Sequence, residues 1–402
     1  MKGFFLMGRP GRGLPRTVVA VGLVSLLTDI SSEMIYPLLP VFLATVLGAG
    51  PMALGLIEGV ADATASLIKL ASGILSDRTG RRKPLLVGGY AVSSLMRPFI
   101  GLAASWPTVL GLRFLDRVGK GLRSSPRDAL IADVTPPDRW GAAYGFHRAM
   151  DNSGAVIGPL VAGALLHWGG LSLREIFLWT AIPGAMAVAV AVWGVEESPN
   201  AQPPPAAKSA RADWRELGTP YKQFLAVLLL FTLAETSEVF FLLRLSTLGV
   251  SPAKLALLWS GHNLLRAGIS YTAGALSDRM GRPAMVFLGW GIFVGVYLAF
   301  AWVGSAAALA GVFLVYGLYY GFTESSQRAW VTDMVPARLR GTAFGYYHAT
   351  LGLTTLPASL LFGFLLQTYG HQAPFITSAV IGGLALCLLA VRLPGFKPTQ
   401  GA

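Results

Sequence analysis

The stretch Gly73–Pro84 reads G-I-L-S-D-R-T-G-R-R-K-P, and a shorter version, G-A-L-S-D-R-M-G-R-P, stands at Gly274–Pro283. The two copies lie 201 positions apart, half the length of the 402-residue chain, and each follows a long apolar run. A short Asp-Arg loop with extra basic residues, present twice at half-length spacing, indicates an internal duplication. The sequence therefore predicts two related halves.

Composition places these halves in a membrane. Hydrophobic residues make up 53% of the chain and charged residues only 13%, with a mean hydropathy of +0.58, whereas soluble domains carry about 25% charged residues. The net charge of +12 lies in short loops, which indicates membrane topology and no nucleic-acid partner. The sequence contains one cysteine, Cys387, and no metal-ligand spacing, phosphate-binding loop or nucleophile elbow. We therefore expect no metal, no cofactor and no enzymatic activity.

Twelve apolar segments are long enough to cross a bilayer, since a membrane helix needs about 20 apolar residues. They cover residues 17–46, 53–76, 84–104, 107–128, 140–167, 173–194, 221–248, 253–276, 283–303, 306–327, 341–367 and 372–392. Loops after even-numbered segments are basic, while those after odd-numbered segments hold only Arg174, Arg244 and Lys254. The positive-inside rule then places both termini in the cytoplasm.

This pattern divides the chain into four parts. They are a cytoplasmic tail at 1–16, a six-helix bundle at 17–198, a cytoplasmic linker at 199–219 and a second six-helix bundle at 220–402. The linker contains N-A-Q-P-P-P-A-A-K-S-A-R, a composition that cannot bury a core. Further correspondences link the bundles: Ser31-Ser32-Glu33 matches Thr236-Ser237-Glu238, and Asp62 matches Asn263.

The Asp-Arg loops resemble motif A of the major facilitator superfamily, which joins transmembrane helices two and three in that family. The resemblance covers the whole chain and implies an all-α membrane protein of twelve helices in two pseudo-symmetric six-helix bundles, with substrate between the bundles near the midplane. It also implies a multi-pass transporter of the plasma membrane, the inner membrane in a bacterium, which we expect to act as a monomer.

Three further motifs refine the resemblance. Pro37-Leu38-Leu39-Pro40 is similar to the P-x-x-P pattern of twelve-span drug exporters, and Arg117 with Gly121 resembles motif B, although Lys120 replaces its Gln. Motif C, associated in the family with antiporters, is matched by Gly154, Gly158, Pro159 and Gly163. The alternative interpretation is that these glycines only allow close helix packing.

In the resembling family, motif A forms a latch that closes the cytoplasmic side. Asp77 would lie near the positive N-terminus of the eleventh segment, and the neighbouring arginines would pair with Asp128 or Asp133. Alternatively, the basic loop only sets topology. The expected latch residues are Gly73, Asp77, Arg78, Gly80, Arg81, Asp128, Asp278 and Arg279.

Ionisable side chains inside the segments are the candidate transport site, because a charge at mid-membrane costs about 2.5–3.5 kcal/mol on insertion scales and normally faces a cavity or a partner. Carboxylates whose surroundings change between two states can bind protons differently in each. Glu33, Asp62 and Glu238 are the leading candidates for this role. Alternatively, buried ion pairs such as Arg97 with Asp62 only fix helix packing. The full candidate set is Asp29, Glu33, Glu58, Asp62, Arg97, Arg117, Glu235, Glu238, His262, Asn263 and Arg266.

Three functions remain open at this point. The first is an exporter of small amphipathic or organic solutes, driven by the proton motive force. The second is an uptake symporter for a charged metabolite, metal chelate or siderophore, and the third is a non-transporting membrane sensor or scaffold. For a transporter, the partners would be a small-molecule substrate, protons and the lipid bilayer.

Overall fold

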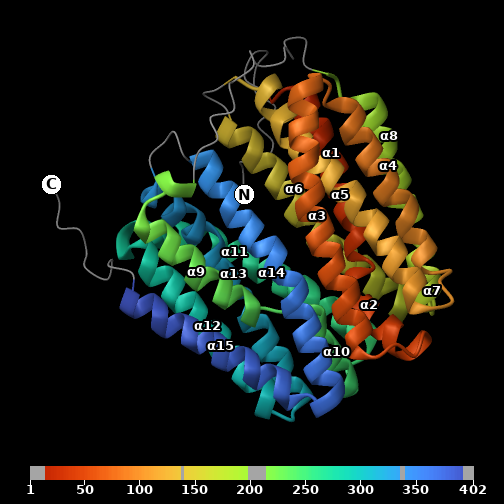
Figure 1. Ribbon diagram of the computed structural model, residues 1–402. Helices are drawn as coiled ribbons and strands as arrows, with labels where there is room; N and C mark the ends of the chain where they lie inside the picture. Colours follow the sequence, from red (N-terminus) through yellow and green to blue (C-terminus); the bar gives the residue numbers. More distant parts are fainter. Residues whose placement is uncertain (1–13, 137–139, 198–213, 336–339, 393–402) are drawn as a thin grey trace, which may run out of the picture.

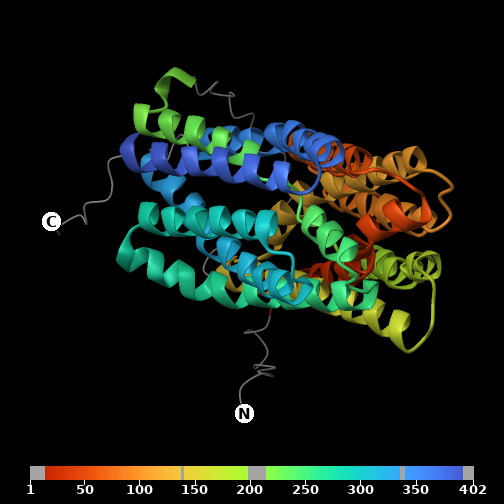
Figure 2. The same cartoon turned by 90° about the horizontal axis from the view of Figure 1, so that it is seen from below.

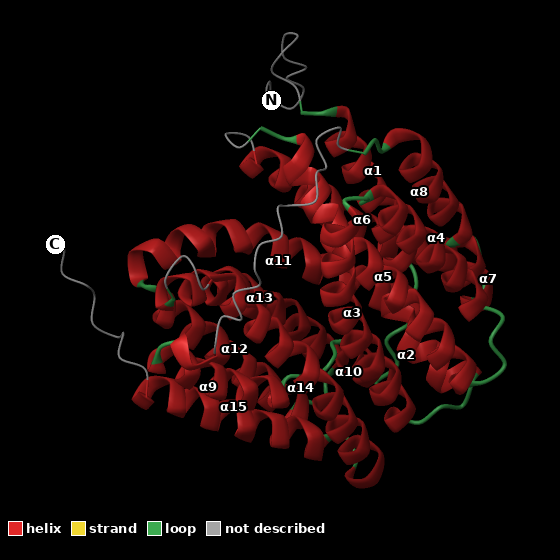
Figure 3. Cartoon of the chain, turned by 45° about the horizontal axis from the view of Figure 1, so that its top comes forward, coloured by secondary structure: helices red, strands yellow, loops and turns green. Residues whose placement is uncertain are grey.

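The computed structural model describes residues 14–136, 140–197, 214–335 and 340–392, and these ranges contain helices and no strand (Figures 1 and 3). Most of the expected tail at 1–16 and of the expected linker at 199–219 lies outside the described residues. The four-part division of the chain therefore stays a prediction.

The first half is a bundle of long helices, drawn red to yellow-green in Figure 1. Its first segment is interrupted, since α1 is followed by a 3₁₀ turn, one short α turn and a π turn. Its elements are α1 (Arg16–Glu33), η1 (Tyr36–Leu38), α2 (Leu39–Val41), η2 (Phe42–Val46), α3 (Pro51–Thr79), α4 (Lys83–Ile100), α5 (Trp106–Val134), α6 (Trp140–His167), α7 (Leu173–Trp179) and α8 (Ala181–Gly194).

The second half forms the neighbouring bundle, green to blue in Figure 1, and the view from below in Figure 2 shows the two bundles side by side. Its first long segment is also broken, between α9 and α10. Its elements are η4 (Trp214–Glu216), α9 (Thr219–Ala234), α10 (Val239–Thr247), α11 (Pro252–Met280), α12 (Arg282–Trp302), α13 (Ala306–Met334), α14 (Arg340–Tyr369) and α15 (Gln372–Arg392).

Nine helical segments of the described ranges are long and apolar enough to cross a membrane. The expected segments built on α4, α5 and α11 fall outside this set. For α5 the cause is a run of ionisable residues in its central part, including Arg113, Asp116 and Lys120. The residues that lower the hydropathy of α5 are therefore the same ones that build the polar site described below.

Both copies of the repeated loop contain a glycine with a positive φ angle. Gly80 ends α3 with φ +64°, and its N–H donates to the Ser76 carbonyl at 3.0 Å. Gly281 stands between α11 and α12 with φ +89°. Positive φ is accessible to glycine without a Cβ clash, so the glycine of each loop permits the sharp turn between consecutive helices.

The two halves contact each other mainly through two helix pairs, α3 with α14 and α6 with α11. Glycines bring the first pair together: a Cβ on Gly55 would lie 2.4 Å from the Ser359 carbonyl oxygen, and one on Gly363 would lie 2.7 Å from that of Pro51. In the second pair, the Ser260 hydroxyl donates to the Val156 carbonyl at 2.9 Å. Small residues at helix crossings are the usual means of packing in lipid.

The glycines of the expected packing motif on α6 also lie where neighbouring helices approach closely. A Cβ on Gly154 would come within 2.6 Å of the Leu26 carbonyl oxygen of α1, and one on Gly158 within 2.7 Å of that of Ile30. Gly163 faces the Ala253 carbonyl of α11 instead. Pro159 lies inside α6. The glycines thus hold α6 against both α1 and α11.

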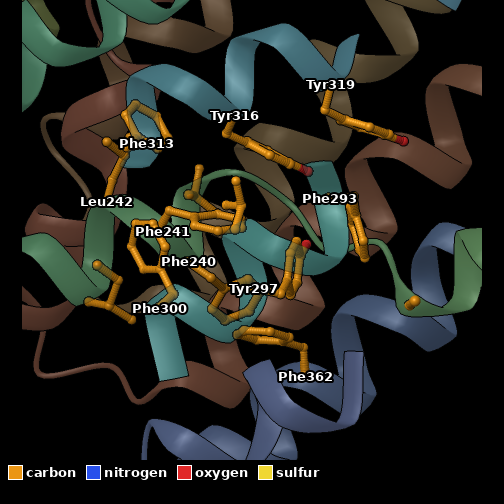
Figure 4. Close-up of a cluster of buried hydrophobic side chains, with 14 of the residues drawn as sticks. Phe240, Phe241, Leu242, Phe293, Tyr297, Phe300, Phe313, Tyr316, Tyr319 and Phe362 are labelled. Carbon is orange, nitrogen blue, oxygen red and sulfur yellow. The ribbon is translucent and has the colours of Figure 1, made fainter. Parts of the chain in front are cut away.

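The core of the second half is rich in aromatic rings (Figure 4). Phe231 stacks on Trp290 with ring centroids 3.9 Å apart, and Phe241 packs against Tyr316 and Tyr297. These rings come from α9, α10, α12 and α13. Aromatic pairs add about 0.5–1.5 kcal/mol each beyond their area burial, so stacking holds these four helices together.

Candidate functional site

A stripe of ionisable side chains follows one face of α5. The stripe consists of Arg113, Asp116, Arg117, Lys120 and Arg123. Apart from the adjacent pair Asp116 and Arg117, successive members are three positions apart, which places them on one side of a helix. All are buried except Lys120, which is exposed although it stands at the middle of the helix. Of these five residues, only Arg117 was among the candidates expected from the sequence. The helical spacing of the other charges was the signal that would have found them.

Two of the candidate residues are tied into buried ion pairs with this stripe. Arg97 of α4 pairs through Nε with Asp116 at 3.1 Å and donates to the Thr28 carbonyl of α1 at 2.9 Å. Glu58 of α3 accepts from Arg113 at 2.8 Å, and Arg113 also lies 3.6 Å from Asp116. The suggested pairing of Arg97 with Asp62 is therefore wrong. Arg97 and Glu58 join α3, α4 and α5 through Asp116 and Arg113.

The remaining charges of the first half form a second group. Lys120 interacts electrostatically with Asp29 and Asp62, and both Lys120 and Arg117 interact with Glu33. Within the described ranges Arg117 forms no hydrogen bond or ion pair, and its Nε is buried. The structure thus brings Asp29, Glu33 and Asp62 around two cations that are not held in close ion pairs.

The site in the second half is built on the break between α9 and α10. Glu235 follows the end of α9 and accepts from the Tyr319 hydroxyl at 3.1 Å. Glu238 precedes α10, and its Oε1 lies 3.3 Å from Nε2 of the fully buried His262 on α11. The other ring nitrogen of His262, Nδ1, donates to the Phe313 carbonyl at 3.2 Å. His262 of α11 and Tyr319 of α13 therefore contact the two glutamates that flank the break.

The other two candidates on α11 have different surroundings. Asn263 donates to the Trp259 carbonyl of its own helix at 3.1 Å. Arg266 pairs with Glu324 of α13 at 3.1 Å and covers the Tyr320 ring, with Cζ 4.3 Å from the ring centroid. Sequence reasoning did not single out Glu324, because only the fold brings α13 beside α11.

The two polar groups meet across the boundary between the halves. The Trp259 indole N–H of α11 donates to Glu33 of α1 at 2.7 Å. Tyr36 contacts Trp259 with ring centroids 4.9 Å apart, and its hydroxyl lies 3.2 Å from that of Ser237. Glu33 and Ser237 belong to the matching Ser-Ser-Glu and Thr-Ser-Glu triplets. The broken first segments of the two repeats therefore touch each other beside the site.

The repeated loops lie at one end of the bundle, which we call the motif A end. Gly73 faces Ser125 of α5, and the loop reaches α5 through Arg82, which pairs with Asp133 at 3.0 Å. The second half has the corresponding pair, Arg282 with Asp333 at 3.6 Å. Of the two acidic partners expected for the loop arginines, Asp133 therefore pairs with Arg82, whereas Asp128 pairs with its neighbour Arg127 at 2.9 Å and Arg81 is exposed. The side chains of Asp77, Arg78, Asp278 and Arg279 lie outside the described residues.

One contact near the motif A end joins the halves directly. Arg148 of α6 lies 3.9 Å from Glu324 of α13, and it also pairs with Asp151 at 3.3 Å. Arg148 is exposed, so this pair is weak. It connects the second-half site, through Arg266 and Glu324, to the edge of the first half.

Metal binding finds no support in the described ranges, where no group of three or more His, Cys, Asp or Glu side chains could hold a metal ion. A mostly apolar cavity of about 500 Å³ lies elsewhere, between the start of α11 and the start of α13. Lys254 is the ionisable residue that lines it, and none of the polar candidates above does so. The polar groups of the candidate site are therefore ion pairs, carboxyl groups and the buried His262.

Comparison with known proteins agrees with this architecture. The family model of the Major Facilitator Superfamily matches residues 21–356 and 239–401. An uncharacterised MFS-type transporter of Methanocaldococcus jannaschii is 32% identical over 386 residues, covering 94% of this chain and 96% of the relative. A multidrug resistance efflux pump homologue of Lactococcus lactis is 27% identical over 347 residues, covering 81% and 83%.

Solved structures give the same fold. A bacterial homologue of the human lysosomal transporter Spinster, in an inward-facing conformation, superposes with a TM-score of 0.74 at 18% identity, covering 93% of this chain and 95% of that one. The proteins of this family and fold are membrane transporters. On the family match across its length and the relative at 32% identity, the chain belongs to the major facilitator superfamily.

Proposed function

We propose that this transporter works by alternating access and couples the export of a small amphipathic or organic solute to the entry of protons. The observation that carries the proposal is the buried contact between Glu238 and His262, next to the Trp259–Glu33 contact that joins the two halves. In the proposed mechanism this pair binds a proton at the boundary that must open and close during transport.

The hydrogen-bonding capacity of this pair supports a proton-binding role. Nδ1 of His262 donates its hydrogen to the Phe313 carbonyl. In a neutral ring, Nε2 is therefore a hydrogen-bond acceptor. Oε1 of an ionised Glu238 is an acceptor too, and the two atoms lie 3.3 Å apart in a buried place. Two buried acceptors at this distance repel unless one proton lies between them. The pair is therefore suited to bind one proton while the halves are in contact.

Alternating access would release that proton. Rocking of one bundle against the other must break the Trp259–Glu33 hydrogen bond and the Tyr36–Ser237 contact, because each joins the halves. Water would then reach the Glu238–His262 pair from the side that opens, and a hydrated carboxylate no longer needs the shared proton. In this scheme the proton affinity of the site differs between the two states, which is the physical requirement for coupling.

The membrane arrangement is part of the proposal. Loop charges favour twelve spans, with both termini and the motif A end in the cytoplasm and the protein in the plasma membrane. The chain would act as a monomer, since each half already presents its own polar group to the other. Lys120, at mid-helix and exposed, would line the path that the solute takes.

Export is favoured over uptake by the match to motif C and by relatives named as multidrug efflux pumps, such as the Lactococcus lactis protein. A specific observation favours the second candidate, an uptake symporter for a charged metabolite or chelate. Arg117 and Lys120 form no close ion pair with Asp29, Glu33 or Asp62, and such cations could bind an anionic group of a substrate.

Proton flux in proteoliposomes tests the proposal. Purified protein would be reconstituted with an internal pH dye, and lipophilic cations, organic anions and siderophores would be added outside in turn. Wild type would be compared with Glu238→Gln and Glu33→Gln, and with Glu196→Gln, an exposed control. We expect compound-dependent proton movement that Glu238→Gln abolishes and Glu196→Gln leaves intact.

The direction of the flux separates the two candidates. Protons that move against the solute indicate an exporter, and protons that move with it indicate a symporter. Solute movement without proton flux, equal in all four proteins, would refute the proposed coupling.

A further inference from the structure

The cavity between the start of α11 and the start of α13 combines one cation with apolar walls. Its volume of about 500 Å³ lies within the range of about 300–1,000 Å³ that is usual for ligand pockets. Lys254 stands near the start of α11, and the second motif A loop follows the end of that helix at Met280. At about 1.5 Å per residue, the two lie roughly 40 Å apart. The cavity is therefore at the end of the second bundle opposite the motif A end.

The walls of the cavity are apolar and are hollowed by small side chains. Leu257 and Leu258 line it from α11, while Ala306, Ala307 and Ala310 line it from α13. The turn at 248–250, between α10 and α11, completes the lining. The Leu257 side chain is 54% exposed. In the membrane arrangement proposed above, an exposed leucine on this face contacts lipid, so the cavity opens toward acyl chains.

The charge of Lys254 has no carboxylate of the protein to balance it. Lys254 is exposed, and it forms no hydrogen bond or ion pair with any described residue. The segments 239–277 and 279–323, which together contain every residue that lines the cavity, hold no aspartate or glutamate. An ammonium group at the rim of an apolar cavity is complementary to an anionic head group such as a phosphate.

The neighbouring residues place Lys254 at the level of the lipid head groups. Trp302 ends α12 and is 63% exposed, and it stands shortly before Ala306, which lines the cavity. Tryptophan is enriched where a bilayer meets water. A lysine near a helix end extends its ammonium group to the same level while its methylene groups cover apolar surface. The cavity thus begins at the head groups and continues along the helices below them.

A second apolar groove lies on the other side of α13, between α13 and α12. It also measures about 500 Å³ and is lined by apolar residues and glycine, including Ala299 of α12 and Ala308 of α13. Gly295 and Gly311 line it as well, and a Cβ added to either would meet nothing within 4 Å. The beginning of α13 is therefore flanked by two apolar hollows, an arrangement that suits a lipid with two acyl chains.

We propose that this end of the second bundle binds one anionic diacyl phospholipid of the outer leaflet. Its phosphate lies at Lys254, one acyl chain fills the cavity between α11 and α13, and the other lies in the groove between α12 and α13. The inference goes beyond the proposed transport and takes from it only the membrane arrangement.

Native mass spectrometry of the detergent-purified protein tests the charge at Lys254. Phosphatidylglycerol and phosphatidylcholine with the same acyl chains would be added at equal concentrations. We expect wild type to bind phosphatidylglycerol more tightly, and Lys254→Gln to weaken that binding about fivefold, the effect of one lysine beside an anionic lipid. Lys254→Arg should keep the preference, as should Lys222→Gln, which removes a lysine near the start of α9 at the motif A end. Equal binding of the two lipids by wild type, or an unchanged preference in Lys254→Gln, would overturn the proposal.

Filling the cavity tests the acyl chain. Ala310→Phe places a ring between α11 and α13 and should remove the binding that depends on Lys254. The matched control is Ala185→Phe, which adds the same ring at an exposed position of α8 away from both hollows and should bind lipid as wild type does. Equal binding by these two variants contradicts occupation of the cavity.

Two further ligands test the class of lipid. Glycerol phosphate has the anionic group without acyl chains, and lysophosphatidylglycerol has a single chain. Both should bind more weakly than the diacyl lipid. Glycerol phosphate bound as tightly as phosphatidylglycerol would show a simple anion site, and lysophosphatidylglycerol bound as tightly would refute the two-chain arrangement.

The lipid measurements are independent of the proposed function. Binding in detergent requires neither a proton gradient nor a solute, so it is measured in the same way whether or not the proteoliposomes show proton flux. A loss of the lipid preference leaves the Glu238–His262 proposal standing, and an absence of proton flux leaves the lipid site standing. Monodisperse size-exclusion profiles of every variant exclude misfolding as the cause of a loss.

Discussion

Replacing Glu58 by alanine should destabilise the first bundle strongly. Glu58 and Arg113 are almost fully buried, with 1% and 5% of their side chains exposed, and their atoms lie 2.8 Å apart. Without Glu58, the guanidinium groups of Arg113 and Arg97 would share the single carboxylate of Asp116. One buried positive charge would then lack compensation, which costs about 3–5 kcal/mol in comparable cases.

The assay is reversible unfolding of the detergent-solubilised protein by titration with sodium dodecyl sulfate. Asp128→Ala is the matched control, because it removes a carboxylate from the same bundle but from the more exposed Arg127–Asp128 pair, which is worth at most about 1 kcal/mol. Exchanging Glu58 and Arg113 together for methionine should recover most of the loss, since no uncompensated charge remains. If Glu58→Ala costs no more than Asp128→Ala, the ion-pair cluster does not hold α3 to α5 and the reasoning is refuted.

Two further predictions use contacts between other helices. Gly154→Ala should lower stability by about 1–3 kcal/mol, the usual cost of overpacking, because its Cβ would meet the Leu26 carbonyl at 2.6 Å. The control is Gly88→Ala, which should be neutral or stabilising because nothing lies within 4 Å of its Cβ. An equal loss of stability at both positions, measured in the same detergent titration, would count against the close packing of α1 on α6. Trp259→Phe removes the 2.7 Å hydrogen bond to Glu33, worth about 1.5–3 kcal/mol for a charged acceptor, and should shift the population toward the state in which the halves separate there. Labelling of a cysteine introduced at Ser237 measures that shift, and unchanged labelling would contradict it.

The broad architecture followed from the sequence because it rests on averages over many residues. Hydropathy located the helical segments, and the repeated loop at half-length spacing indicated two related halves. The described residues are helical without strands, and the family match confirms the predicted family. Residues 198–213 lie outside the structure's description, so the linker that divides the halves stays a prediction.

Pairing between charges was predicted less well. Depth along a helix can be counted from its end, but the direction of a side chain turns by about 100° with each residue, since a helix has 3.6 residues per turn. Arg97 was assigned to Asp62 from depth alone, whereas the rotation of α4 points it at Asp116. The break after Glu33 contains Pro37 and Pro40, and proline is a sequence signal for helix interruption. The break between α9 and α10 holds no proline and lies between apolar runs, so the sequence did not reveal it.

The charged stripe of α5 has a consequence for how the chain is made. A helix with Arg113, Asp116 and Arg117 near its centre pays about 2.5–3.5 kcal/mol for each such charge on insertion scales, so α5 cannot enter lipid as an independent segment. The partners that neutralise it, Glu58 on α3 and Arg97 on α4, emerge earlier from the ribosome. During biogenesis α5 must therefore leave the translocon together with α3 and α4, and the order of helices along the chain is also the order in which the first bundle can be assembled.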